Sequence, residues 1–87
     1  MVHKLSTLTV LRFQAEISQQ DLGNEAGLSQ AYISEFERGL AIPSHIADRL
    51  IRTLRPHLPP EWKEIEITRA DLSAPWVGSR LQNLTVK

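Results

Sequence analysis

The sequence predicts a small, mainly α-helical fold: a bundle of four short helices, followed by a C-terminal extension with strand-like patterns. Before residue 56, apolar residues recur at spacings of three and four, the period of a helix face. Serine and glycine stand where those helices should begin and end. Pro56, Pro59 and Pro60 each remove a backbone donor, so residues 56–60 are predicted to link residues 1–55 to residues 61–87.

Two helices are expected in the first part of the chain. The apolar stripe of the first comprises Leu8, Leu11 and Ala15. Ser18, with Asp21 three residues later, is a capping-box arrangement, so the second helix is expected at residues 19–26. Gly27 can adopt the positive φ that ends a helix and reverses the chain.

The third helix should follow at once. Ser29 can cap it only two residues beyond Gly27, and Gly39 can end it. Its apolar stripe consists of Ile33 and Phe36. The glycine turn between the second and third helices is therefore very short.

A fourth helix is predicted between two prolines. Ser44, after Pro43, is expected to cap it. It should end near Leu54, because Pro56 disfavours helical geometry at Arg55.

The extension, residues 61–87, is too apolar and too balanced in charge, with four basic and four acidic residues, to be disordered. KEIEIT (63–68) alternates polar with apolar residues, and RLQNLTV (80–86) is a looser extended pattern, so strands are predicted in both. We expect the extension to hold two subunits together, and the alternative is that it only completes the monomer core. The expected dimerisation residues are Trp62, Ile65, Ile67 and Trp76.

The composition excludes several functions. Ten basic and ten acidic residues give no overall attraction to nucleic acid or to an acidic membrane. The sequence has no cysteine, membrane span or signal peptide, so a cytoplasmic protein is expected. The three histidines have no metal-binding spacing, and no nucleophile motif or phosphate loop occurs. We therefore expect no enzymatic activity, no cofactor and no bound metal.

Two helices joined by so short a turn must cross steeply, and a helix-turn-helix places the second helix of such a pair in the DNA major groove. Residues 11–54 resemble the Cro/phage-repressor (Xre-type) helix-turn-helix family, whose fold is lambda-repressor-like. The matching positions are Arg12, Ile17-Ser18-Gln19, Leu22, Gly27, Leu28-Ser29-Gln30, Ile33, Phe36-Glu37-Arg38-Gly39, Pro43-Ser44 and Leu54.

The chain departs from the family pattern at two places. Gly23 stands at the tight crossing where relatives usually have alanine, and glycine costs about 1 kcal/mol of helix propensity there. After the third helix, relatives often carry basic residues that touch phosphate, whereas this loop is Leu40-Ala41-Ile42. We therefore expect weaker attraction to the DNA backbone than in a typical member.

The resemblance assigns roles to individual residues. Glu37 lies beside the buried stripe, and in the family it pairs with the arginine that matches Arg12. Gln30 corresponds to a glutamine that reads adenine, and Gln19 to one that braces it. Glu35 either accepts from a cytosine amino group or stays in solvent. The residues expected to face DNA are Gln19, Gln30, Ala31, Tyr32, Ser34, Glu35 and Arg38, with Lys4 as a further phosphate contact.

These features predict a transcriptional regulator, most readily a repressor, that binds a pseudo-palindromic double-stranded operator as a homodimer. A restriction-modification controller or an antitoxin of the same fold is an alternative, because only the partner and the operon differ. The competing class is a protein-interaction module that keeps the fold without binding DNA. The neutral charge and the uncharged loop after the third helix motivate that alternative.

Overall fold

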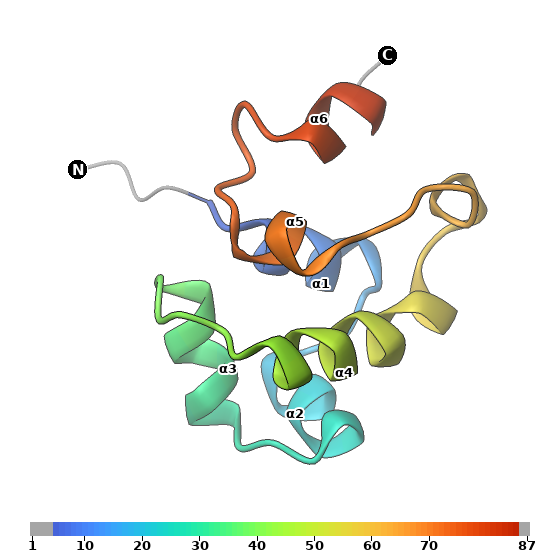
Figure 1. The fold of residues 1–87 in the computed structure, drawn as a ribbon. Coiled ribbons are helices and arrows are strands. Elements are labelled where there is room, and N and C mark those ends of the chain that lie inside the picture. Colours follow the sequence, from blue (N-terminus) through green and yellow to red (C-terminus); the bar gives the residue numbers. More distant parts are fainter. Residues whose placement is uncertain (1–4, 86–87) are drawn as a thin grey trace.

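The structure is a computed structural model, which describes residues 5–85. Six α-helices and two 3-10 turns make up this part of the chain, with four of the helices in the first segment, as the apolar spacing predicts (Figure 1). They are α1 (Thr7–Gln14), α2 (Gln19–Ala26), α3 (Gln30–Glu37), α4 (Ser44–Leu54), η1 (Arg55–His57), η2 (Pro60–Trp62), α5 (Arg69–Ser73) and α6 (Arg80–Thr85). No helix among residues 5–85 combines the length and the apolar character needed to cross a membrane.

Local signals define both ends of α2 as predicted. The Ser18 hydroxyl accepts a hydrogen bond from the backbone N–H of Asp21 at 3.0 Å. Gly27 ends the helix with a φ of +74°, a conformation that glycine adopts without steric cost. Only half of the predicted capping box forms among the described residues: the Asp21 carboxylate does not accept a hydrogen bond from the backbone N–H of Ser18.

The ends of α3 are also as predicted, but the start of α4 is not. Ser29 Oγ accepts from the backbone N–H of Tyr32 at 3.2 Å, and Gly39 beyond the helix has a φ of +117°. Ser44 does not cap α4, because Pro43 occupies the N-cap position and Ser44 is the first helical residue. The fixed φ of Pro43, −58°, with extended ψ places the boundary one residue earlier than predicted.

The helix α4 ends at Leu54 as predicted. The predicted cause, a loss of helical geometry at Arg55 before Pro56, was wrong. Arg55 keeps helical angles (φ −52°, ψ −48°) despite preceding Pro56. The chain instead tightens into the 3-10 turn η1. Proline is tolerated there because the first positions of a helical turn need no donor.

The strands predicted in the extension do not form. Among residues 5–85 the only β-type pairing is an isolated bridge between Ser6 and Pro75. In KEIEIT the alternation does bury Ile67 and half-bury Ile65, but no neighbouring segment completes a ladder. The second segment forms α6 instead, with Ser79 Oγ accepting from the backbone N–H of Gln82 at 3.1 Å in the manner of a helix cap.

The extension belongs to the same hydrophobic core as the four helices. Its most buried side chains are Trp62, Ile67, Leu72 and Leu81, which join Leu8, Leu11, Leu50 and Leu54 in one cluster. In Figure 1, α5 lies beside α1, and backbone hydrogen bonds between Thr7 N and Ala74 O (3.1 Å) and between Trp76 N and Leu5 O (2.8 Å) tie the two segments. The Pro-rich stretch therefore turns the chain back onto the bundle.

Polar contacts join the two helices of the extension, α5 and α6, to each other. Thr68 and Asp71 form a complete capping box at the start of α5, and Arg80 of α6 also binds the Asp71 carboxylate. Burial alone would raise the pKa of Asp71, but Arg80 and Thr68 together hold this pKa below its ordinary value. A carboxylate with a depressed pKa stabilises the fold above its unfolded-state pKa, and the contribution is lost as the pH falls through the folded value.

The crossing between α2 and α3 is close because residue 23 is a glycine. The backbone N–H of Leu28 donates to the Gly23 carbonyl at 2.7 Å. A Cβ atom added to Gly23 would lie 2.6 Å from the carbonyl oxygen of Leu28, a backbone atom that cannot move aside alone. Glycine at position 23, where relatives usually have alanine, thus allows a closer approach of the two helices than alanine would permit.

The shared core predicts unequal effects for two leucines of α6. Leu81→Ala should lower the free energy of unfolding by about 2–5 kcal/mol, because the side chain is fully buried in the core. Leu84→Ala, the same change on an exposed side chain of the same helix, should cost about 0.5 kcal/mol or less. Urea denaturation followed by circular dichroism measures both values. Equal small losses would show that α6 does not pack on the bundle.

The close crossing predicts that Gly23→Ala destabilises the protein. Alanine gains about 1 kcal/mol of helix propensity, but overpacking against backbone costs about 1–3 kcal/mol. The expected net loss is up to about 2 kcal/mol. Asn24→Ala, at an exposed position of α2, is the matched control and should not destabilise the protein. A Gly23→Ala variant more stable than wild type would contradict the close approach.

Candidate DNA-binding surface

The helix α3 has a buried face and an exposed face. Ile33 is fully buried and Phe36 nearly so. The side chains at positions 30, 31, 34, 35 and 38 lie three or four residues apart and so share the opposite side, and all are exposed except the half-buried Ser34. The predicted DNA-facing residues of α3 therefore form one surface, which we call the outer face.

A buried ion pair fixes the end of α3 against α1. Nε of Arg12 donates to Oε2 of Glu37 at 2.6 Å, and Nη2 donates to Oε1 at 3.3 Å. The Arg12 and Glu37 side chains are 12% and 7% exposed. Arg12 also donates to the Ile17 carbonyl at 3.1 Å, so it holds the turn before α2 as well. This is the pair that the family resemblance implies.

Two glutamines extend this ion pair to the outer face. Nε2 of Gln19 donates to Oε1 of Glu37 at 3.0 Å. Nε2 of Gln30 in turn contacts Oε1 of Gln19 at 3.5 Å, a long hydrogen bond. Because an ionised carboxylate only accepts, Glu37 fixes which end of the Gln19 amide points inward, and Gln19 then fixes the Gln30 amide. Gln30 keeps its Oε1 acceptor and one N–H donor for an outside partner.

Glu35 and Arg38 pair with each other on the outer face. Nη2 of Arg38 donates to Oε1 of Glu35 at 2.6 Å, and both side chains are more than half exposed. Each was considered separately from the sequence, although their i, i+3 spacing would have predicted the pair. Arg38 is thus not an isolated cation at the end of α3.

Tyr32 stands at the edge of the outer face with an aromatic partner. Its ring stacks on Phe36 with centroids 5.3 Å apart and planes 18° apart, while 52% of the residue remains exposed. One face of the Tyr32 ring is therefore packed against the buried Phe36. Ala31 next to it is exposed and offers only a methyl group.

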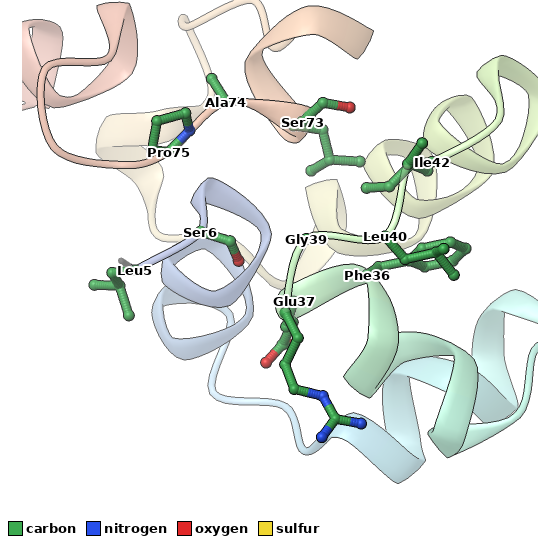
Figure 2. Close-up of a pocket in the computed structure, with 13 residues that line it drawn as sticks. Leu5, Ser6, Phe36, Glu37, Gly39, Leu40, Ile42, Ser73, Ala74 and Pro75 are labelled. Atoms are coloured by element: carbon green, nitrogen blue, oxygen red, sulfur yellow. The ribbon is translucent and has the colours of Figure 1, made fainter. Parts of the chain in front are cut away.

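The loop after α3 is apolar and borders a groove. The groove has a volume of about 770 Å³ and lies between this loop, the start of α1 and the segment after α5 (Figure 2). Leu40 and Ile42 form one wall, with Ala74 and Pro75 on another, and Leu40 is 47% exposed. Leu40, Ala41 and Ile42 include no lysine or arginine that could bind a phosphate.

One exposed aromatic residue beside the ion pair was not predicted. Phe13 is 60% exposed, and the guanidinium carbon of Arg12 lies 4.7 Å from the centre of its ring. It covers part of the Arg12 side chain at the end of α1. Its position outside the Leu8, Leu11, Ala15 stripe was the available signal. Lys4, expected to touch phosphate, lies outside the described residues.

The four residues expected to form a dimer fall into two groups, one buried in the core and one half-buried. Trp62 and Ile67 lie in the core of their own chain, as the alternative expectation of a completed monomer core requires. Ile65 and Trp76 are half-buried against that core, and the Trp76 ring lies 6.4 Å from that of Trp62. Of these four residues, only Ile65 and Trp76 keep surface that another subunit could contact directly.

The two ion pairs of α3 should differ sharply in their contribution to stability. Glu37→Gln should lower the free energy of unfolding by about 3–5 kcal/mol, because the buried Arg12 guanidinium loses its counter-ion. Glu35→Gln, the same change in the exposed pair, should cost about 1 kcal/mol or less. Urea denaturation of both variants makes the comparison. A Glu37→Gln variant as stable as wild type would mean that the pair does not hold α3 in place.

Comparison with known proteins agrees with this geometry. A protein-family model described as helix-turn-helix matches residues 10–55, which contain most of α1, all of α2 to α4 and the whole outer face. No curated protein and no solved structure matches the chain. The match covers more than half of the 87 residues, so this chain belongs to the helix-turn-helix family of the Cro/phage-repressor, Xre-like type.

Proposed function

We propose that the protein is a transcriptional regulator, acting as a repressor in the cytoplasm, that inserts α3 into the major groove of a pseudo-palindromic operator. The observation that carries this proposal is the relay from Glu37 through Gln19 to Gln30. It presents one acceptor and one donor from the first residue of a helix whose outer face is exposed. No enzymatic activity is part of the proposal.

The orientation of the Gln30 amide favours adenine. Adenine presents an N6 donor and an N7 acceptor in the major groove, which match the free Oε1 and N–H of Gln30. Guanine presents two acceptors there and would leave Oε1 of Gln30 facing another acceptor. Since the buried Glu37 carboxylate sets the direction of the relay, reversing the Gln30 amide would break its contact with Gln19.

A homodimer is the second part of the proposal. One helix-turn-helix offers few base and phosphate contacts, and two half-sites one helical turn apart double them. Here the need is greater, because Arg38 is the only lysine or arginine between Arg12 and Arg49. Ile65 and Trp76 are the candidate contacts with surface available to a second subunit. Sedimentation equilibrium at micromolar concentration tests this part, and a monomer that binds a single half-site would contradict it.

The same shortage of cations favours a second candidate function, a protein-interaction module. Residues 19–37, from α2 through α3, carry four carboxylates and no lysine or arginine. The apolar loop at Leu40 adds no cation for a phosphate. DNA binding whose affinity falls steeply as salt rises would favour the regulator, and its absence would favour the interaction module. A restriction-modification controller or an antitoxin remains within the regulator class.

Selection of bound duplexes from a random pool should yield a two-fold symmetric site. Gln30→Ala should then relax the preference at one A·T pair of each half-site by about 1–3 kcal/mol, because the bidentate contact is lost. Gln20→Ala is the matched control: Gln20 is exposed on α2 beside Gln19 and has no hydrogen bond to Gln30, so base preference should be unchanged. An unaltered preference in Gln30→Ala would remove Gln30 from base reading.

A further inference from the structure

The outer face of α3 exposes one cation, and a carboxylate of the same helix binds it. Arg38 lies 2.6 Å from Glu35, with the two side chains 70% and 53% exposed. The other carboxylate of α3, Glu37, is already bound by Arg12. Since no other lysine or arginine occurs between Arg12 and Arg49, the single cation that this surface offers a phosphate is already engaged.

A DNA phosphate and the Glu35 carboxylate would compete for the same guanidinium. Both anions accept charge-assisted hydrogen bonds from arginine. The pair is exposed and only three residues apart, so it is weak enough for DNA to break. Breaking it nevertheless reduces the gain from each phosphate contact, and it leaves the Glu35 charge unpaired beside the phosphates.

We propose that Glu35 restrains Arg38 on DNA of arbitrary sequence and releases it at the correct site, where a base-edge donor replaces the guanidinium. The cytosine N4 amino group is the major-groove donor from which glutamate accepts. At such a base pair Glu35 gains a new partner, and Arg38 is free to donate to a phosphate. At other base pairs Glu35 finds no base-edge donor and keeps Arg38 as its partner, so the base contact and the backbone contact are lost together.

This inference rests on the proposed DNA binding and adds a role to it. Glu35 becomes a specificity-determining residue that couples base reading to backbone binding. The coupling makes non-cognate binding weaker than the local charge alone would make it. It also gives a reason for an acidic residue on a surface that faces a polyanion.

A double-mutant cycle on a mixed-sequence DNA duplex tests the restraint without knowledge of the operator. Glu35→Gln should raise affinity for this duplex about two- to fivefold, the range available from an exposed ion pair. The slope of log affinity against log salt should also steepen by up to about one per subunit, because Arg38 then contacts phosphate. In an Arg38→Gln background, the same Glu35→Gln change should give a smaller gain. Circular dichroism checks that all variants are folded.

The control separates the restraint from simple loss of negative charge. Asp21→Asn removes one carboxylate from an exposed position on α2 without touching Arg38, so its gain should be the same in both backgrounds. A gain from Glu35→Gln that is equal with and without Arg38 would overturn the inference and leave DNA binding intact. Failure of every variant, and of wild type, to bind duplex in a salt-dependent way would overturn the proposed function and the inference with it.

Discussion

The buried ion pair between Arg12 and Glu37 is the constraint on which the geometry of the helix-turn-helix depends. It joins the end of α1 to the end of α3, and Arg12 also holds the turn before α2 through the Ile17 carbonyl. Its second effect is directional. A carboxylate that can only accept fixes the Gln19 amide, and through it the amide of Gln30. A structural charge in the interior thus determines the donor and acceptor pattern presented at the surface.

The ion pair depends in turn on the extension. The helix α1, which carries Arg12, contacts α5, and backbone hydrogen bonds on both sides of Pro75 join Thr7 at its start and the preceding Leu5 to the extension. Trp62 and Leu81 reach the core from turns and helices that lie far along the chain from α1. Residues 61–85 therefore act as part of the scaffold that positions the outer face. Their apolar content, which suggested a contact between subunits, is largely used within the chain.

The fold of the first segment could be predicted because its signals are local. Ser18 and Gly27 define α2 by hydrogen bonds and backbone angles that involve only neighbouring residues. The extension was harder, because alternation in KEIEIT reports which residues turn inward but not whether a partner strand exists. Ser79, whose hydroxyl accepts from the backbone N–H of Gln82, was a local signal for α6 that the sequence-based prediction did not consider. Tertiary packing decided these cases.

The candidate site shows the same limit. Resemblance to the family paired Arg12 with Glu37 and Gln19 with Gln30, although the two members of each pair are well separated in sequence. The pairing of Glu35 with Arg38 was missed because residue roles were assigned one at a time. A helical period shows which side chains share a face, and the partner of each depends on rotamers that coordinates reveal.

The separation of α3 into two faces bears on how this protein can change over generations. Ile33, Phe36 and Glu37 maintain the scaffold, while positions 30, 31, 34 and 35 point away from it. Substitutions at the second set can alter preference for a target with little effect on folding. A few substitutions at these outer positions could therefore change the target that the protein prefers. Replacing residues 56–85 as one block by recombination would instead remove part of the hydrophobic core.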